Sequence, residues 1–392
     1  MIKRFSAVSI FVSLVLLSLS LTGTAFSQAP LYDPSARALY KALPPHNYYP
    51  NEQPAEPAAQ LTQWTFDWTS SYNKAKYSSV IVGTNPSTTN TTTTVGVGII
   101  PVKMVFGASN GNMTFDPASI YFATLTTTEM VNDSPIFKSE IDFKQGGTDL
   151  GKTQYEDAYQ RGNFWGSVKT NNNYHLIFQT EVVPGELVLN VPAAYGSVIG
   201  NPWSGIPTGT ADINWFDAQL QGVINAYSCS KIKPPCIGPN VLPLFITYNV
   251  YLTEFGECCI GGYHSALLGA PAGQTYSYST SISQANVVGG VFSQDIGALA
   301  HEMGEWVMDP FITNPSPCPS NGILEVGDPL ETGPNFGDYP YTIDGFTYHP
   351  QDLVFITWFG APPATSLDVW NGVTKDVVTF QNETLAVCET AE

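Results

Sequence analysis

The segment from 295 to 310 holds the densest group of side chains that could bind a metal ion or move a proton. One histidine and three carboxylates fall within nine residues, in the run His301-Glu302-Met303-Gly304-Glu305 and the following Asp309. This concentration stands out, because only 12% of the 392 residues are charged and only 5 are histidine. Residues four apart project from one face of a helix, so His301, Glu305 and Asp309 could hold a single ion. Glu302 would lie beside that face.

The same segment predicts a helix from about Gln294 to Asp309. Ser293 can cap its N-terminus, and Pro310 disfavours helical geometry at the residue before it. Apolar residues recur with helical spacing and form a stripe roughly 100° wide that would face a core. They are Ile296, Leu299, Ala300, Met303 and Val307. An ordinary solvated face is the alternative interpretation of the polar residues opposite this stripe.

The run from His301 to Glu305 resembles the active-site helix of the zincin metallopeptidases, which carries H-E-x-x-H. Both histidines bind zinc in that family and the glutamate is the general base, so the resemblance implies that His301 is a ligand and Glu302 is catalytic. Here Glu305 stands where zincins have the second histidine. A carboxylate binds zinc at ~2.0–2.2 Å, but it shifts the preference toward harder ions and partly neutralises the charge that acidifies water.

In the gluzincin branch of this family, the third ligand is a glutamate some two dozen residues after the first histidine. Glu325 stands 24 residues after His301, and the nearby Asp328 could replace or support it. Gly327 and Pro329 argue against the second helix that gluzincins use. The metzincin pattern fits less well, because the residues after Glu305 supply neither its glycine nor its third histidine.

A second local feature is the glycine-rich run Cys258-Cys259-Ile260-Gly261-Gly262-Tyr263-His264-Ser265, about 37 residues before His301. His264 could be a further metal ligand or a hydrogen-bond donor to the transition state, although an isolated histidine is more often structural. Together with the segment from Ala298 to Phe311, this run resembles the secreted phosphate-induced, exordium-like proteins of plant cell walls. The resemblances cover about a tenth of the chain.

The beginning of the chain predicts export. Residues 1–27 have the features of a signal peptide: a basic start, an apolar run from Ile10 to Leu21, and a small-x-small cleavage site before Gln28. No later stretch approaches the ~20 apolar residues of a membrane span. The formal net charge of −18 argues against nucleic acid or an anionic membrane as a partner. We therefore expect a secreted or periplasmic protein, and its oligomeric state stays open.

The cysteines predict disulfides, because their number is even and exported thiols usually oxidise. All six lie in the last 164 residues: Cys229, Cys236, Cys258, Cys259, Cys318 and Cys388. The first two are close enough to close one small loop. The adjacent middle two would form a strained ring, so we expect each of them to pair with one of the last two.

We expect an α+β fold with a β-rich N-terminal half and a zincin-like, disulfide-stapled C-terminal half. The proposed division is an extended leader at 28–60, a β-rich region at 61–210 and a zincin-like region at 211–392. β-Branched runs bounded by Gly, Asn and Pro predict strands at 78–82, 93–102, 104–106, 174–178, 187–189 and 242–252. Helices are expected at Asp157–Trp165 and Asp212–Asn225.

Two functions remain open. The first is a secreted zinc-dependent hydrolase that cleaves a peptide or protein substrate: His301, Glu305 and either Glu325 or Asp328 hold the ion. Glu302 would then deprotonate the attacking water. The second is a non-catalytic protein of the cell envelope or matrix, in which these residues bind a structural Ca²⁺ or no metal. Other hydrolase and nucleotide-binding classes are not expected, because the chain lacks G-x-S-x-G, a P-loop and a dinucleotide fingerprint.

Overall fold

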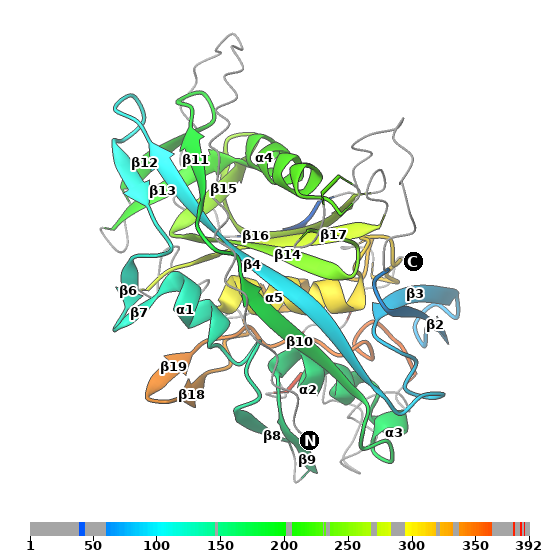
Figure 1. Ribbon diagram of the computed structural model, residues 1–392. Helices are drawn as coiled ribbons and strands as arrows, with labels where there is room; N and C mark the ends of the chain where they lie inside the picture. The colour runs from blue at the N-terminus through cyan, green and yellow to red at the C-terminus, as the bar shows by residue number, and fades with distance from the viewer. Residues whose placement is uncertain are drawn as a thin grey trace.

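The structure is a computed structural model that describes residues 39–43, 60–145, 148–200, 206–229, 231–232, 236–267, 273–283, 295–318, 322–331, 337–362, 379–380, 385 and 388. Within these residues, an 11-stranded mixed sheet runs through the molecule (Figure 1). Its strands are β1 (Leu39–Ala42), β4 (Thr92–Phe106), β5 (Met113–Phe115), β10 (His175–Val182), β11 (Leu187–Val191), β12 (Gly196–Gly200), β13 (Pro207–Asp212), β14 (Val241–Tyr248), β15 (Val250–Glu254), β16 (Glu257–Leu267) and β17 (Gln274–Ser281).

The remaining described elements surround this sheet. Four two-stranded hairpins are formed by β2 (Gln63–Thr69) with β3 (Lys76–Val82), β6 (Ile120–Phe122) with β7 (Leu125–Thr126), β8 (Ile141–Gln145) with β9 (Thr148–Thr153), and β18 (Tyr341–Ile343) with β19 (Phe346–Tyr348). The helices are α1 (Thr127–Asn132), α2 (Tyr155–Asn163), α3 (Trp165–Val168), α4 (Ile213–Ala226), α5 (Gly297–Met308) and α6 (Asp328–Glu331). The expectation of a β-rich molecule with a few helices is confirmed.

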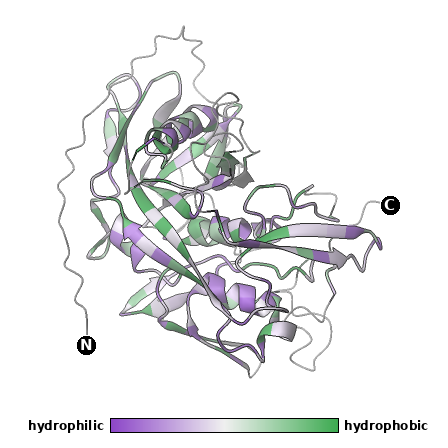
Figure 2. Ribbon diagram, turned by 45° about the vertical axis from the view of Figure 1, so that its right-hand side comes forward, coloured by the Kyte–Doolittle hydropathy of each residue, from purple (hydrophilic) through white to green (hydrophobic). Residues whose placement is uncertain are grey.

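The order of the strands brings distant parts of the chain together. Along the main path the order is β10-β4-β14-β17-β16-β15-β13-β12, so β4 pairs with β10 on one side and with β14 on the other. Strand β4 is long because two predicted runs, at 93–102 and 104–106, merge into it, and hydrophobic residues are concentrated in such strands of the large sheet (Figure 2). The sheet therefore contains strands from both sides of residue 210.

Strand β16 separates two helices that lie on opposite faces of the sheet (Figure 1). Side chains alternate between the faces of a strand. Tyr263 points to α4, where its hydroxyl donates to Asp217 at 2.9 Å. The next residue, His264, points to α5, where its Nδ1 lies 3.0 Å from Glu302 Oε2. Every described residue of β16 after Glu257 is buried, so both faces of this strand belong to the interior.

Helix α5 is shorter than expected and wholly buried. It runs over Gly297–Met308, and Asp309 leaves the helical conformation before Pro310, as the sequence predicts. The proposed cap Ser293 lies outside the described residues. The stripe of Ile296, Leu299, Ala300, Met303 and Val307 is buried as expected. The opposite face is not solvated, because Glu302 and Glu305 are also 0% exposed. The interpretation of an ordinary solvated face is therefore wrong.

Three cysteine pairs lie at disulfide distance. Cys229 pairs with Cys236, as predicted. The other pairing is a correction: Cys318 pairs with Cys388, 70 positions apart, and Cys258 pairs with its neighbour Cys259. The prediction based on strain failed because Cys318 and Cys388 bond to each other. The adjacent two, at the beginning of β16, are then left as partners. Disulfide pairs are compatible with an extracellular protein.

The segments predicted to direct export fall largely outside the described residues. This applies to the signal peptide at 1–27 and to most of the leader at 28–60, of which the structure describes 39–43 and 60. In the described part of the chain, no helix has the length and apolar character needed to cross a membrane.

Candidate metal centre

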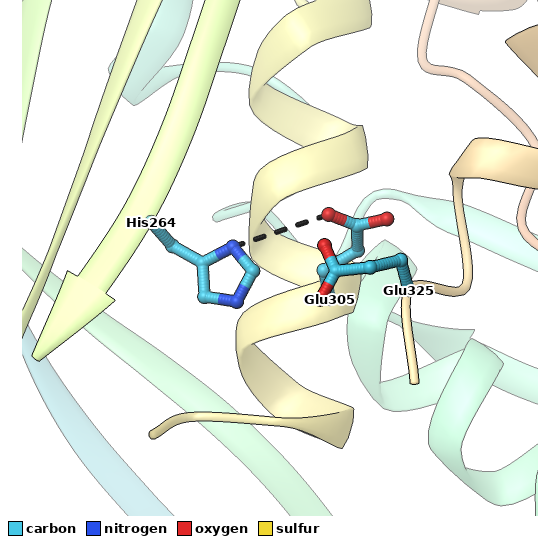
Figure 3. Close-up of side chains that lie close together, drawn as sticks. All are labelled: His264, Glu305 and Glu325. Carbon is cyan, nitrogen blue, oxygen red and sulfur yellow. Dashed lines mark ion pairs between the residues drawn. The ribbon is translucent and has the colours of Figure 1, made fainter. Parts of the chain in front are cut away.

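Side chains from three segments meet on the α5 side of β16. Helix α5 contributes His301, Glu302 and Glu305, and β16 contributes His264. The segment from 325 to 331, which ends in α6, contributes Glu325, Asp328 and Glu331. Three groups of three residues have ligand atoms within 4.8 Å of one another: His264, Glu305 and Glu325; His301, Glu302 and Glu305; and His301, Asp328 and Glu331. Figure 3 shows the first group, with His264 pointing from its strand toward the two carboxylates.

His301 presents its Nε2 atom to carboxylate oxygens. Its other ring nitrogen, Nδ1, lies 2.6 Å from Gln351 Oε1, and the Gln351 amide donates to the carbonyl of Gly327 at 3.2 Å. That second bond orients the amide so that Oε1 accepts from Nδ1–H. Nε2 then carries the lone pair, at 3.1 Å from Glu305 Oε2 and 3.6 Å from Asp328 Oδ1. An acceptor that faces two acceptors requires a proton or a metal ion between them.

Glu305 is held at the centre of the cluster. Its Oε1 accepts a hydrogen bond from Gly327 N–H at 3.0 Å, and a hydrogen bond joins its carboxyl group to that of Glu325. Its Oε2 lies 3.9 Å from His264 Nδ1 in addition to its contact with His301. Among the described residues, no lysine or arginine forms an ion pair with Glu305 or Glu325. Two carboxyl groups are thus buried together without a cationic side chain.

Glu302, the expected general base, lies over β16. Its Oε2 contacts His264 Nδ1 at 3.0 Å. A Cβ added to Gly262 would lie 2.7 Å from Glu302 Cγ, so the glycine lets the carboxylate approach the strand. Gly327 has a similar role beside His301, because a Cβ there would lie 2.3 Å from Nδ1. Two glycines on different segments therefore leave room for the central side chains.

Burial dominates the protonation of this cluster. It lowers the pKa of His264 to about 3 and the pKa of His301 to about 4, so both imidazoles are neutral at pH 7. Burial, with the charge of Asp328, raises the pKa of Glu305 well above its usual value. Burial and Glu305 do the same for Glu325. Burial without a cation therefore favours the protonated form of these carboxyl groups, whereas a bound metal ion would favour the ionised form.

Asp309 lies directly after α5, and its side chain contacts the following loop. Its carboxylate accepts from the backbone N–H groups of Thr313 at 2.9 Å and Asn314 at 3.0 Å, which closes the turn after α5. Burial nevertheless raises its pKa to about 7. The carboxylate of Asp309 therefore binds the backbone of this loop. This explains why Asp309, unlike His301 and Glu305, belongs to none of the groups of possible ligands.

Sequence reasoning missed two residues of the site. Gln351, which fixes the ring of His301, lies 50 positions away and has no motif of its own. Glu331 follows Asp328 by three residues, a helical spacing that could have suggested it. Asp328 is the partly exposed member of the cluster, with 27% of its side chain accessible. The other central side chains are 0% exposed: His264, His301, Glu302 and Glu305.

Two contacts of His301 have the spacing expected of ligands on one zinc ion. The ligands of a tetrahedral zinc, at bond lengths of ~2.0–2.1 Å, lie about 3.3 Å from one another. The distances from His301 Nε2 to Glu305 Oε2 and Asp328 Oδ1, 3.1 and 3.6 Å, bracket that value. Calcium takes six to eight oxygen ligands, and two histidines at the centre do not suit it.

Comparisons with protein-family models, with curated proteins and with solved structures find no match.

Proposed function

We propose that this protein is a metal-dependent hydrolase, built on a variant of the zincin helix and acting on a polypeptide. One observation carries the proposal: the lone pair of His301 Nε2 faces the oxygens of Glu305 and Asp328 in a buried cluster without a lysine or arginine partner for Glu305. Burying carboxylates without a compensating cation is costly, and an ion bound between them and His301 would offset that cost. His301 and Glu305 would hold the ion, and Asp328, which contacts His301 but shares no ligand group with Glu305, would have to turn its partly exposed carboxylate inward to become the third ligand.

The other side chains have separate tasks. A zinc ion in this position would supply a Lewis acid that polarises the scissile carbonyl and acidifies water. Glu302 would accept the proton of the attacking water and pass it to the leaving amine. His264 contacts Glu302 at 3.0 Å and would hold its carboxylate in place, whereas Glu325 orients Glu305 through the hydrogen bond between their carboxyl groups. Gln351 fixes the tautomer of His301.

The experiment is elemental analysis of the purified protein together with a peptide-library cleavage assay. We expect about one zinc per chain and cleavage that a chelator abolishes and zinc restores. The variant Glu305→Gln should lose the ion, because a neutral amide cannot replace a carboxylate ligand. A protein that binds calcium, or no ion, and cleaves no peptide would instead support the non-catalytic envelope or matrix protein.

A further inference from the structure

The proposed catalytic residues are closed off from solvent on the side of β16. Glu302, His264 and Glu305 are all 0% exposed. A polypeptide must bring its backbone to within hydrogen-bond distance of the general base to be cleaved. Some part of the chain must therefore leave before an extended substrate can reach Glu302.

The N-terminal strand β1 occupies the edge of β16 beside Glu302. It runs parallel to β16, with Tyr40 opposite Gly262 and Ala42 opposite His264. The N–H of Leu43 donates to the carbonyl of His264 at 3.2 Å, and the hydroxyl of Ser265 donates to the carbonyl of Leu43 at 3.0 Å. Strand β1 also contacts α5. Its backbone therefore passes the position where Glu302 overlies Gly262.

This edge of β16 is shared by two strands. On its other edge, β16 pairs with β17 over Gly262–Leu267. On the edge where β1 lies, β15 pairs with β16 only from Glu257 to Ile260. Strand β1 takes over from Ile260 to His264. Without β1, the main-chain groups of β16 next to the catalytic cluster would have no strand partner on this edge.

We propose that residues 39–43 are an internal strand that keeps the protein latent, and that their departure opens this edge to an extended polypeptide substrate. The inference rests on the proposed hydrolase function and names its substrate class and its control. An unpaired edge binds an extended chain through main-chain hydrogen bonds, with little dependence on its sequence. Strand β1 is only four residues long, so a longer substrate strand makes more of these bonds than the segment it replaces.

The test cuts the leader within the full-length protein. A recognition sequence for a specific protease is inserted between residues 45 and 60, and the segment before it is removed by gel filtration after cleavage. We expect hydrolysis of extended peptides to rise by at least 10-fold after the cut. The controls are the uncut insertion protein and the wild type treated with the same protease, and both should keep the low rate.

A binding measurement separates this inference from the hydrolase proposal. A fluorescent peptide with the sequence of residues 36–45 is titrated into the cut protein that also carries Glu302→Gln, so that no cleavage is needed. We expect saturable binding that unlabelled peptide displaces. The matched control peptide has proline in place of Leu43, lacks the N–H that meets His264, and should bind at least 10-fold more weakly.

The outcomes are distinguishable. Binding of the peptide with no hydrolysis before or after the cut would support the edge site and remove the hydrolase proposal. Equal hydrolysis before and after the cut, or failure of the peptide to bind, would overturn the internal strand and leave the hydrolase proposal standing on its metal analysis. A rate that rises after the cut but is not inhibited by the added peptide would also overturn it.

Discussion

Each face of β16 contacts a buried carboxylate, but the two carboxylates differ in their hydrogen-bond partners. On the α4 side, Asp217 accepts hydrogen bonds from the hydroxyls of Tyr263 and Tyr276 and from the amide of Gln221. On the α5 side, Glu305 receives one backbone N–H, shares a hydrogen bond with the carboxyl group of Glu325 and faces His301 Nε2. Both groups are at least 97% buried.

The number of donors distinguishes the two sites better than burial does. A carboxylate surrounded by hydroxyl and amide donors is satisfied by the fold itself and stabilises the packing of helix on sheet. A carboxylate that faces further acceptors needs a proton or a metal ion between them. We therefore interpret Asp217 as structural and Glu305 as functional, although both lie on helices packed against the same strands.

The largest effect is expected from Glu302→Gln, which should separate chemistry from ion binding. The amide keeps the size of the side chain but cannot accept the proton of water. Hydrolysis should fall by about 10²–10⁴, while the bound metal and the melting temperature stay nearly unchanged. Initial rates, elemental analysis and thermal unfolding of the two proteins check this. Full activity in the variant would remove Glu302 from the proposed chemistry.

The next effect is expected from His301→Asn, which should weaken ion binding by more than about 100-fold. His349→Asn is the matched control, because His349 also contacts a carboxylate, Asp295 Oδ2 at 2.6 Å, but lies outside the cluster with 24% of its side chain exposed. Competition with a fluorescent zinc chelator measures both affinities. Equal affinities in the two variants would place the ion elsewhere.

On the α4 side, Asp217→Ala should reduce the free energy of unfolding by about 3 kcal/mol, because it leaves buried hydroxyl and amide donors without their acceptor. The zinc content should not change. The exposed Asn214→Ala on the same helix is the control and should cost less than about 0.5 kcal/mol. Urea unfolding with elemental analysis tests the contrast. Loss of zinc from the Asp217 variant would show that both faces of β16 belong to one site.

The smallest effect is expected at Glu156 on α2, a buried carboxyl whose two oxygens have no hydrogen-bond partner. Burial raises its pKa well above the usual value. The folded protein must therefore keep a proton that the unfolded chain releases above its pKa of about 4.3, and stability falls as pH rises from there. Glu156→Gln should remove a slope of about 1 kcal/mol per pH unit.

The control is the exposed Glu140→Gln, which should change the free energy of unfolding by less than about 0.5 kcal/mol. Urea unfolding between pH 5 and 8 in steps of one unit gives the slopes of the three proteins. Parallel curves for the wild type and Glu156→Gln would show that this carboxyl is ionised in the folded state.

Local signals predicted α4 and α5 well, whereas the helix expected at Asp157–Trp165 begins at Tyr155 and is interrupted at Phe164, and α1 was not predicted. Helix α4 begins after Asp212, whose side chain caps the N–H of Trp215, within one residue of the predicted boundary. Helix α5 ends where Pro310 requires. The spacing of His301 and Glu305 alone was sufficient to bring their side chains to 3.1 Å, because four residues make about one helical turn.

Contacts between distant segments were much harder to foresee. The contact of His264 with Glu302 depends on β16 lying under α5, and the sequence does not reveal which strand a helix will cover. The burial of the polar face of α5 depends on the segments from 325 to 328 and from 349 to 353, which carry no regular pattern. The wrong pairing of Cys258 came from weighing the strain of one bond without its competitors.

The length of β4 also bears on how the chain folds and aggregates. Its residue Gly96 pairs with Gln179 in β10 and with Val241 in β14, so the second partner is synthesised about 145 residues later. Until then β4 is a long strand rich in valine and isoleucine with open edges, which is the kind of segment that associates between chains. Gly96, Gly98 and Pro101 interrupt it and lower that tendency during folding.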